Sequence, residues 1–247
     1  MVSQPARNVI ENVVLAPKKR QSIKCVVWDL DNTLWDVDPV IERAEARWLD
    51  WLRENCPRIP EKLSMEELRA SRLALAAREP HNAHDFTYLR IASLAQHARE
   101  CGYDESISEQ AFEIFIAERN RLDLYPDVRT GLARLSTRYA LATLSNGNAD
   151  LARIGVADLF SVSLNARGIG AAKPDRRCFE RLVQHLNLEP HEVIYVGDDP
   201  LLDVEAGRAA GLKTAWINRT GLPWPATIEP ADFNVADCLD LAALLGT

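Results

Sequence analysis

The sequence predicts an α/β protein, with a doubly wound, Rossmann-like parallel sheet as its core and an all-helical domain inserted into it. Short apolar segments alternate with helical patterns along most of the chain, as in right-handed β-α-β units. Residues 36–124, between the first and second apolar segments, contain helical patterns and no good strand. We therefore expect an N-terminal tail (1–21), an α/β core (22–35 and 125–247) and a helical insert (36–124).

Four apolar segments predict the strands of the sheet. In chain order they are 25–28, 139–144, 193–196 and 213–217. Short, continuous apolar runs are typical of strands that are buried on both faces of a parallel sheet. Helical patterns over 127–137 and 175–186 supply the crossovers between them.

The insert carries several signals for helix starts and ends. We expect Asp38 to be the N-cap of a helix whose first residue is Pro39. Capping-box patterns at 64–67 and 106–109 predict two further helix starts, and Gly102 stands where a helix is expected to end. The insert is therefore predicted to be all-helical.

Composition narrows the class of protein. The chain has 247 residues, of which 47% are hydrophobic and 26% charged, as is typical of soluble globular proteins. No apolar run reaches the roughly 18 residues of a membrane-spanning helix, and the first residues lack the apolar stretch of a secretory signal. The formal net charge of −7 disfavours nucleic-acid binding, which normally needs a basic face. We expect a cytoplasmic protein that binds neither membranes nor nucleic acid.

The cysteines agree with a reducing compartment. Their number is odd and no C-x-x-C pattern occurs, so we expect reduced, mostly buried side chains. They are Cys25, Cys56, Cys101, Cys178 and Cys238.

Two carboxylates follow the first predicted strand. Asp29 and Asp31 are two residues apart and are followed by Thr33. Packing requires neither acid at a strand end, and two nearby carboxylates repel each other. A divalent cation would relieve that repulsion, and carboxylate and carbonyl oxygens suit magnesium. Because ligands bind outside the carboxyl ends of the strands in such sheets, we expect a site here.

Further polar groups follow the other predicted strands. Ser145 follows the second strand, where its hydroxyl and nearby N–H groups could bind a phosphate oxygen. Lys173 supplies a cation just before a predicted helix. Asp198, Asp199 and Asp203 supply acids after the third strand. The polar residues therefore gather where the geometry of the fold places a site.

This ordered set resembles the four motifs of the haloacid dehalogenase (HAD) superfamily. Those motifs are D-x-D-x-T/V, a Ser or Thr after the second core strand, a Lys, and an acidic G-D-x-x-x-x-D signature. Here they are represented by 29–33, Ser145, Lys173 and 197–203. The resemblance covers about residues 24–240 and implies that the insert is a helical type I cap.

The resemblance implies a role for each acid of the first motif. Asp29 would attack phosphorus and form an aspartyl-phosphate. Asp31 would protonate the leaving alkoxide and later deprotonate water, with Thr33 orienting it. Magnesium would be bound by the Asp29 carboxylate, the Asp31 backbone carbonyl and Asp198.

The remaining motif residues would bind phosphate or support the groups that do. Ser145 and Lys173 would hold the non-bridging oxygens. Asp203 would position Lys173 by hydrogen bonding, and Asp199 would be either a further partner or a helix N-cap. For Asn146, turn chemistry and direct phosphate contact both remain open.

Asp31 also discriminates among the activities of the superfamily. True dehalogenases need no acid to protonate a halide, so an Asp at this position favours phosphoryl transfer. Phosphonatases use a lysine of the cap. The insert contains one lysine, Lys62, and its place in a polar stretch before a capping box disfavours phosphonatase activity. The expected partner is therefore a small-molecule phosphomonoester, and the sequence does not predict an oligomeric state.

A closer resemblance is to bacterial phosphatases that act on 5-amino-6-(5-phospho-D-ribitylamino)uracil, an intermediate of riboflavin synthesis. Segments 31–36, 86–90, 145–150 and 164–170 carry it. Four residues of the cap are candidates for substrate specificity, because an aromatic face and polar donors suit a flat ring joined to a polyol. They are His84, Phe86, Tyr88 and Arg90.

Two alternative functions stay open. One is a phosphatase of broad specificity for sugar phosphates or nucleotides, since the core motifs recognise only the phosphate. The other is a receiver-like signalling domain, which also carries a phosphorylatable Asp with a Ser or Thr and a Lys. A receiver is much shorter, however, and has no helical insert.

Overall fold

The computed structural model describes residues 22–247, so the predicted tail lies outside the described residues. Within this range, six strands form one sheet in the order β3-β2-β1-β4-β5-β6, and all neighbours are parallel. The strands are β1 (Cys25–Trp28), β2 (Ala140–Ser145), β3 (Val162–Asn165), β4 (Val193–Gly197), β5 (Lys213–Ile217) and β6 (Phe233–Val235). The predicted α/β fold class is confirmed.

The sequence prediction missed the two edge strands. In β3, half-buried residues alternate with exposed ones, so the strand lacks the continuous apolar run of a central strand. β6 has only three residues, which is shorter than most strands. Both edges therefore carry weaker hydrophobic signals than the four central strands.

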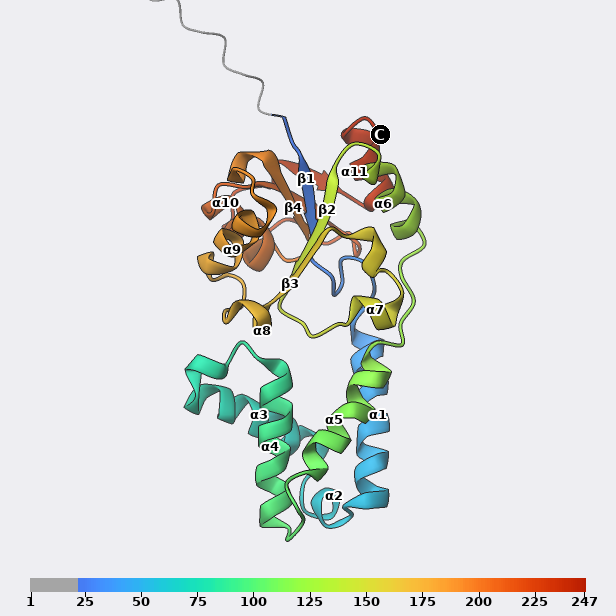
Figure 1. The fold of residues 1–247 in the computed structure, drawn as a ribbon, viewed down its shortest axis with the longest axis vertical. Coiled ribbons are helices and arrows are strands. Elements are labelled where there is room, and N and C mark those ends of the chain that lie inside the picture. The colour runs from blue at the N-terminus through green and yellow to red at the C-terminus, as the bar shows by residue number, and fades with distance from the viewer. Residues whose placement is uncertain (1–21) are drawn as a thin grey trace, which may run out of the picture.

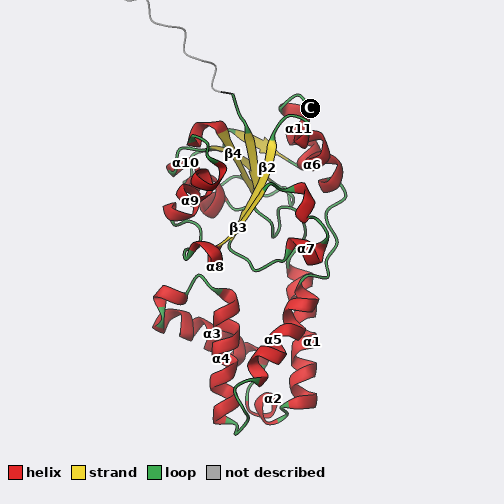
Figure 2. Ribbon diagram, viewed as in Figure 1, coloured by secondary structure: helices red, strands yellow, loops and turns green. Residues whose placement is uncertain are grey.

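Helices cover both faces of the sheet, as Figures 1 and 2 show. Those of the α/β part are α6 (Val128–Ser136), α7 (Leu151–Ile154), α8 (Ala166–Ile169), α9 (Arg176–Leu186), α10 (Ala206–Ala209) and α11 (Cys238–Leu244). Val26 and Trp28 of β1 pack in one hydrophobic cluster with α6 and α11. Cys25 and Val27 face the opposite cluster, which includes α9. Alternate side chains of the central strand thus supply two separate cores, as a doubly wound sheet requires.

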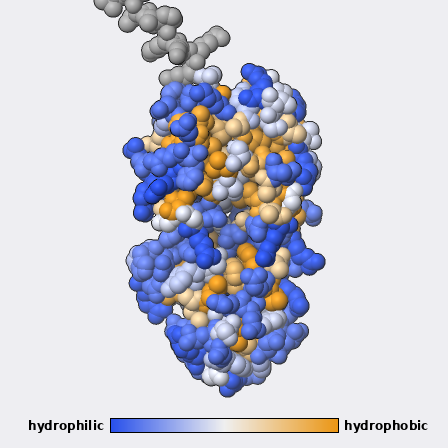
Figure 3. Space-filling model, viewed as in Figure 1, coloured by the Kyte–Doolittle hydropathy of each residue, from blue (hydrophilic) through white to orange (hydrophobic). Residues whose placement is uncertain are grey.

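The chain between β1 and α6 forms only helices among the described residues. They are α1 (Asp38–Asn55), α2 (Arg58–Lys62), α3 (Met65–Arg78), α4 (Phe86–Glu100) and α5 (Ile107–Arg119). We call residues 38–119 the helical region. Its core includes Trp48, Leu94 and Phe115, from three different helices. Figure 1 shows the region beyond the carboxyl ends of the strands, and Figure 3 shows a small hollow where the two parts meet.

Two of the predicted helix starts differ from the structure. The capping box of Ser64 and Glu67 is present, with reciprocal hydrogen bonds of 3.2 and 2.8 Å. Ser106 makes no side-chain cap, and its N–H instead donates to the Asp104 carboxylate at 2.8 Å. Asp38 is the first helical residue rather than the residue before the helix.

No helix in the described range has the length and apolarity needed to cross a bilayer.

Candidate active site

The loop after β1 carries the first pair of acids. The N–H of Asp29 donates to the Val196 carbonyl at 2.8 Å, which continues the pairing of β1 with β4. The chain then turns at Asn32, whose φ of 59° lies in the left-handed region that Asn tolerates. The side-chain oxygen of Asn32 accepts from the Val37 N–H at 3.0 Å, which fixes the exit of the loop. The turn brings Asp29 and Asp31 to the rim of one cavity.

Lys173 is the central cation of the site and is almost completely buried. Its Nζ donates to Asp29 Oδ1 and to Asp203 Oδ1, each at 2.6 Å. A third bond goes to the Tyr195 hydroxyl at 2.9 Å, which in turn donates to the Leu144 carbonyl at 2.7 Å. All three protons of the ammonium group therefore have acceptors. The predicted pairing of Lys173 with Asp203 is present.

Asn146 fixes the backbone of Lys173. Its side-chain Nδ2 donates to the Lys173 carbonyl at 2.9 Å, and its Oδ1 accepts from the Lys173 N–H at 2.7 Å. Both ends of the amide are therefore used within the protein. Asn146 therefore positions Lys173, while turn chemistry and direct phosphate contact both stay predictions.

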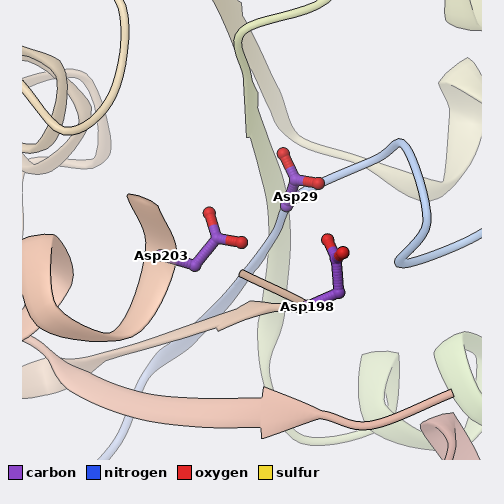
Figure 4. A group of neighbouring side chains, drawn as sticks. All are labelled: Asp29, Asp198 and Asp203. Carbon is purple, nitrogen blue, oxygen red and sulfur yellow. The ribbon is translucent and has the colours of Figure 1, made fainter. Parts of the chain in front are cut away.

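Three carboxylates come together beside Lys173, and we call Asp29, Asp198 and Asp203 the acid cluster. One oxygen from each lies within 4.8 Å of the others, and Figure 4 shows the three groups around a common space. Burial, opposed by Lys173, raises the pKa of Asp29 to about 8. Burial and the neighbouring Asp203 raise the pKa of Asp198 to about 7.

The charge of the acid cluster fits a divalent cation. One ammonium group is not enough to balance three carboxylates, and the charge of Asp203 adds to the effect of burial in raising the pKa values of Asp29 and Asp198. The donors are hard oxygens of the kind that magnesium prefers. The predicted set had the side chains of Asp29 and Asp198 with the backbone of Asp31, whereas the geometric cluster has Asp203 as its third member.

Thr33 lies differently from the expectation. Its hydroxyl is 3.4 Å from Asp29 Oδ2 and 3.3 Å from Asp198 Oδ1, so it orients these two acids rather than Asp31. The reason is that the turn at Asn32 directs Thr33 back toward β4, while Asp31 faces the helical region. The expected contact of Thr33 with Asp31 is therefore wrong.

Asp31 is held by two residues that the sequence did not indicate. Its Oδ1 accepts from Trp35 Nε1 at 2.7 Å. Nη2 of Arg119 contacts both carboxylate oxygens, at 2.6 and 2.9 Å. Arg119 is the last residue of α5 and is 1% exposed, and in the sequence it looks like an ordinary basic residue at a helix end. No local signal distinguishes it, because its partner lies 88 positions away.

Two glycines allow close approaches at the site. A Cβ on Gly147 would lie 2.7 Å from Asp31 Oδ2, and one on Gly197 would collide with the Asp203 carboxylate. The N–H of Gly147 also donates to the Ser145 hydroxyl at 3.0 Å. A larger residue at either position would displace a carboxylate of the site.

Asp199 is a helix N-cap, one of its two predicted roles. Its Oδ1 accepts from the N–H groups of Leu201 and Leu202 at 2.8 and 2.9 Å. Its own N–H donates to Asp203 Oδ2 at 3.0 Å. Asp199 therefore shapes the wide helical turn, Pro200–Glu205, that carries Asp203.

Two residues that come after β4 in the chain hold the loops that follow β1 and β4, which we call the acidic loops. Trp216 of β5 donates from Nε1 to the Asp198 carbonyl at 2.7 Å. Arg219, just after β5, donates to the Thr33 carbonyl at 3.1 and 2.9 Å. It also pairs with Asp127 at 2.7 Å, before α6. Both loops are thus tied to elements outside the predicted motifs.

The site cavity has a volume of about 360 Å³ and receives residues from both parts of the molecule. The core lines it with all the predicted motif side chains except Thr33, and the helical region adds Ile41, Phe86 and Arg119. Of the other specificity candidates, Arg90 lines an adjoining cavity. His84 and Tyr88 line neither of these two cavities in the described part of the chain. Tyr88 is directed to Glu79, to which its hydroxyl donates at 2.7 Å.

Comparisons with known proteins agree with this geometry. A model of the haloacid dehalogenase-like hydrolases matches residues 23–211. The chain is 31% identical over 199 residues to the 5-amino-6-(5-phospho-D-ribitylamino)uracil phosphatase YigB of Escherichia coli, covering 79% of this chain and 83% of that protein. It is 35% identical over 144 residues to a phosphoserine phosphatase of Thermus thermophilus, covering 56% and 57% of the two chains.

Solved structures extend the comparison. A 2-haloacid dehalogenase from Pseudomonas syringae superposes with a TM-score of 0.86 at 32% identity, covering 90% of this chain and 98% of that one. A HAD phosphatase from Thermococcus onnurineus gives a TM-score of 0.65 at 25% identity, covering 91% and 98%. The phosphatase relatives and Asp31 favour phosphatase chemistry within the family. The chain belongs to the haloacid dehalogenase-like hydrolases, as its motifs predicted, and is a phosphatase of the HAD type.

Proposed function

We propose that this protein is a magnesium-dependent phosphomonoester hydrolase that works through an aspartyl-phosphate on Asp29. The observation that carries the proposal is the contrast between two acids at one cavity. Asp29 lies within the acid cluster, bonded to Lys173. Asp31 lies outside that cluster and is held by Trp35 and Arg119. Two carboxylates in such different surroundings suit two different roles.

The reaction has two steps. In the first, a carboxylate oxygen of Asp29 attacks phosphorus, the bond to the ester oxygen breaks, and protonated Asp31 gives its proton to the leaving alkoxide. In the second, water attacks the phosphorus of the aspartyl-phosphate and gives a proton to Asp31, which restores both carboxyl groups. Asp31 therefore acts first as an acid and then as a base.

The remaining site residues hold the phosphoryl group. The Ser145 hydroxyl and Lys173 would bind its non-bridging oxygens, where their charge and dipole favour the transition state. A magnesium ion held by Asp29, Asp198 and the Asp31 carbonyl would supply further charge compensation for the phosphoryl oxygens. Thr33 would keep the Asp29 and Asp198 carboxylates in place, as its 3.4 and 3.3 Å contacts indicate.

We propose that residues 36–124 act as the cap and 22–35 with 125–247 as the core. Two contacts support this, because they hold the start of α4 against the core on either side of Phe86. Asp85 pairs with Arg167 at 3.3 Å, and the Thr87 hydroxyl accepts from Asn148 at 3.2 Å. A cap held in this way excludes bulk water from the phosphoryl group.

The substrate we favour is 5-amino-6-(5-phospho-D-ribitylamino)uracil. The YigB relative, named for that activity, supports the choice. Phe86 supports it too, since it lines the site cavity and the residue is 50% exposed, so its ring could stack on a flat ring of the substrate. A phosphatase of broad specificity is the alternative.

The test is a ranking of kcat/KM by purified protein. The ribitylaminouracil phosphate is compared with ribose 5-phosphate, a nucleoside monophosphate and flavin mononucleotide, with 2-chloropropionate as a dehalogenase control. We expect the ribitylaminouracil phosphate to rank first and 2-chloropropionate to be inert. Exhaustive chelation should abolish turnover, and magnesium should restore it.

Two results would contradict these proposals separately. If ordinary sugar phosphates rank first, the substrate assignment fails and the phosphatase chemistry stands. If turnover survives chelation, or chloride is released from 2-chloropropionate, the proposed chemistry fails.

A further inference from the structure

A second cavity, of about 430 Å³, lies in the helical region. Three residues line both this cavity and the site cavity: Ile41, Phe86 and Asn148. The two spaces therefore adjoin each other. A molecule whose phosphate lies at Asp29 can extend past Phe86 into the second cavity.

The polar wall of this second cavity has an excess of positive charge. Glu45 of α1 is 3% exposed, accepts hydrogen bonds from Arg69 and Arg72, and forms an ion pair with Arg90. Nε of Arg69 lies at 2.7 Å, Nη2 of Arg72 at 2.8 Å and Nη2 of Arg90 at 3.5 Å. We call these four residues the arginine cluster. Burial raises the pKa of Glu45, but its hydrogen bond to Arg69 and the charges of Arg90 and Arg72 outweigh this and lower it, so the carboxylate is ionised.

Arg90 is the least satisfied member of the arginine cluster. Its side chain is 11% exposed and lies over the Phe115 ring, with 3.5 Å from Cζ to the ring centroid. Its Nη1 is buried and has no hydrogen-bond partner in the part of the chain that the structure describes. Burial and the charge of Arg72 lower the pKa of Arg90 to about 9, which leaves it protonated at neutral pH. A buried N–H group without an acceptor is costly. Because Nη1 itself is buried, a ligand oxygen can reach it only when the Arg90 side chain shifts, and such a ligand would supply the missing acceptor.

The rest of the cavity wall is apolar. Leu73 and Phe86 line it and are 73% and 50% exposed, which is unusual for large apolar side chains. Leu89 and Phe115 continue the same surface. This combination suits an organic group that has an apolar body and oxygen acceptors at its far end.

We propose that this cavity binds the end of the substrate remote from the phosphate, through acceptor oxygens that contact Arg90 and Arg72. The inference rests on the proposed phosphatase function and specifies its substrate class. The acceptor is either a carbonyl of a neutral ring or a carboxylate. A cationic group at that end would be repelled by the arginine cluster.

The test uses aryl phosphates that differ only at the far end of the ring. They are phenyl phosphate, 4-carboxyphenyl phosphate, 4-carbamoylphenyl phosphate and 4-(aminomethyl)phenyl phosphate. For each substrate, kcat/KM of a variant is divided by that of the wild type, so that intrinsic leaving-group reactivity cancels. The variants are Arg90→Met and Arg90→Lys, with Arg72→Met as a second site in case Arg90→Met folds poorly.

We expect Arg90→Met to lower kcat/KM for the carboxy or carbamoyl substrate about 10- to 100-fold more than for phenyl phosphate, mainly through KM. A larger loss for the carboxy compound identifies an anionic group, and a larger loss for the carbamoyl compound identifies a neutral carbonyl. Arg90→Lys should restore part of the loss. Arg78→Met is the matched control, since Arg78 is an exposed residue of α3 that does not line the cavity.

Equal losses for all four substrates, or none, would overturn the inference while leaving the phosphatase proposal intact. Preferential hydrolysis of the aminomethyl compound by the wild type would overturn it as well. If the wild type hydrolyses no phosphomonoester at all, it is the proposed function that fails.

Discussion

The core and the helical region each contain a cluster of charged side chains, and the two clusters have an excess of charge of opposite sign. In the core, the acid cluster places three carboxylates around Lys173. In the helical region, the arginine cluster places three guanidinium groups around Glu45. Buried charge that is not balanced is unfavourable to folding. Each cluster is therefore better explained by a ligand of opposite charge or polarity than by stability.

The two clusters also differ in how far their charged side chains are exposed to water. The Lys173 side chain is 3% exposed, whereas that of Arg69 is 52% exposed. Water screens an exposed charge, so changes in the acid cluster should have larger effects than changes in the arginine cluster. This difference suits a reacting centre in the core and a recognition surface in the helical region.

The largest effect is expected from Asp29→Asn, which removes the nucleophile of the acid cluster. An amide cannot form the phospho-enzyme, so turnover of any phosphomonoester should fall below detection. The measurement is steady-state phosphate release, with circular dichroism to verify folding. Activity near that of the wild type would show that Asp29 is not the nucleophile.

Asp31→Asn should have the next largest effect, because Asp31 lies outside the acid cluster and transfers only protons. We expect a loss of about 10² to 10⁴ in kcat, typical of a general acid or base. Rapid-quench measurements should find that both formation and breakdown of the phospho-enzyme become slower. If Asp31→Asn lost all activity while Asp29→Asn kept it, the two roles would be reversed.

A smaller effect is expected from Arg119→Met, which removes the link between α5 and Asp31. Loss of a buried, charged hydrogen bond should lower kcat about 10- to 100-fold, with a smaller change in KM and a shifted pH profile. Arg119→Lys should recover part of the rate. Arg121→Met, at a side chain that is 78% exposed, is the matched control. A change confined to thermal stability would limit Arg119 to a structural role.

The smallest effect concerns stability and pH. Without metal, the raised pKa values of Asp29, about 8, and Asp198, about 7, mean that the folded state retains protons that the unfolded state has lost. This contribution to stability is present near pH 4 and is lost as the pH rises toward 8. We expect the Tm of the metal-free protein to fall over this range, and added magnesium to raise Tm more at pH 8 than at pH 5.

The magnesium effect should be a few degrees, since about 1 kcal/mol shifts the Tm of a domain of this size by roughly 2–4 °C. Asp198→Asn removes one charge of the acid cluster and should reduce both the pH slope and the response to magnesium. A magnesium response that does not depend on pH or on Asp198 would argue against a metal at the acid cluster.

The sequence predicted the core side of this site well. Asp29 and Asp198 each follow a buried parallel strand and Ser145 is the last residue of another, and the carboxyl ends of such strands meet at one edge of the sheet. Strand patterns alone are enough to bring them together. Lys173 was found from its place before a helix, and the structure does bring it between Asp29 and Asp203.

Sequence reasoning found only part of the helical side of the site. Phe86 and Arg90 were candidates, and each lines at least one of the two cavities. Arg119 and the partners of Arg90 were not found, because they depend on how α1, α3, α4 and α5 pack, and helix periodicity does not specify which helices meet. Closeness in sequence was also a poor guide to which side chains line the site. Tyr88 is two residues after Phe86, but its hydroxyl donates to Glu79. The direction of Thr33 depended on a single left-handed residue, Asn32.

The hydrogen bonds that hold the two acidic loops have a consequence for the exchange of segments between related chains. The match to the hydrolase family ends at residue 211, before Trp216 and Arg219. These two residues nevertheless hold the Asp198 and Thr33 carbonyls. A chimera that exchanges the residues after 211 would keep every predicted motif but replace the supports of two of the loops that carry them. The part of the chain that shapes this site therefore extends past the residues that the family model matches, into the last strands of the sheet.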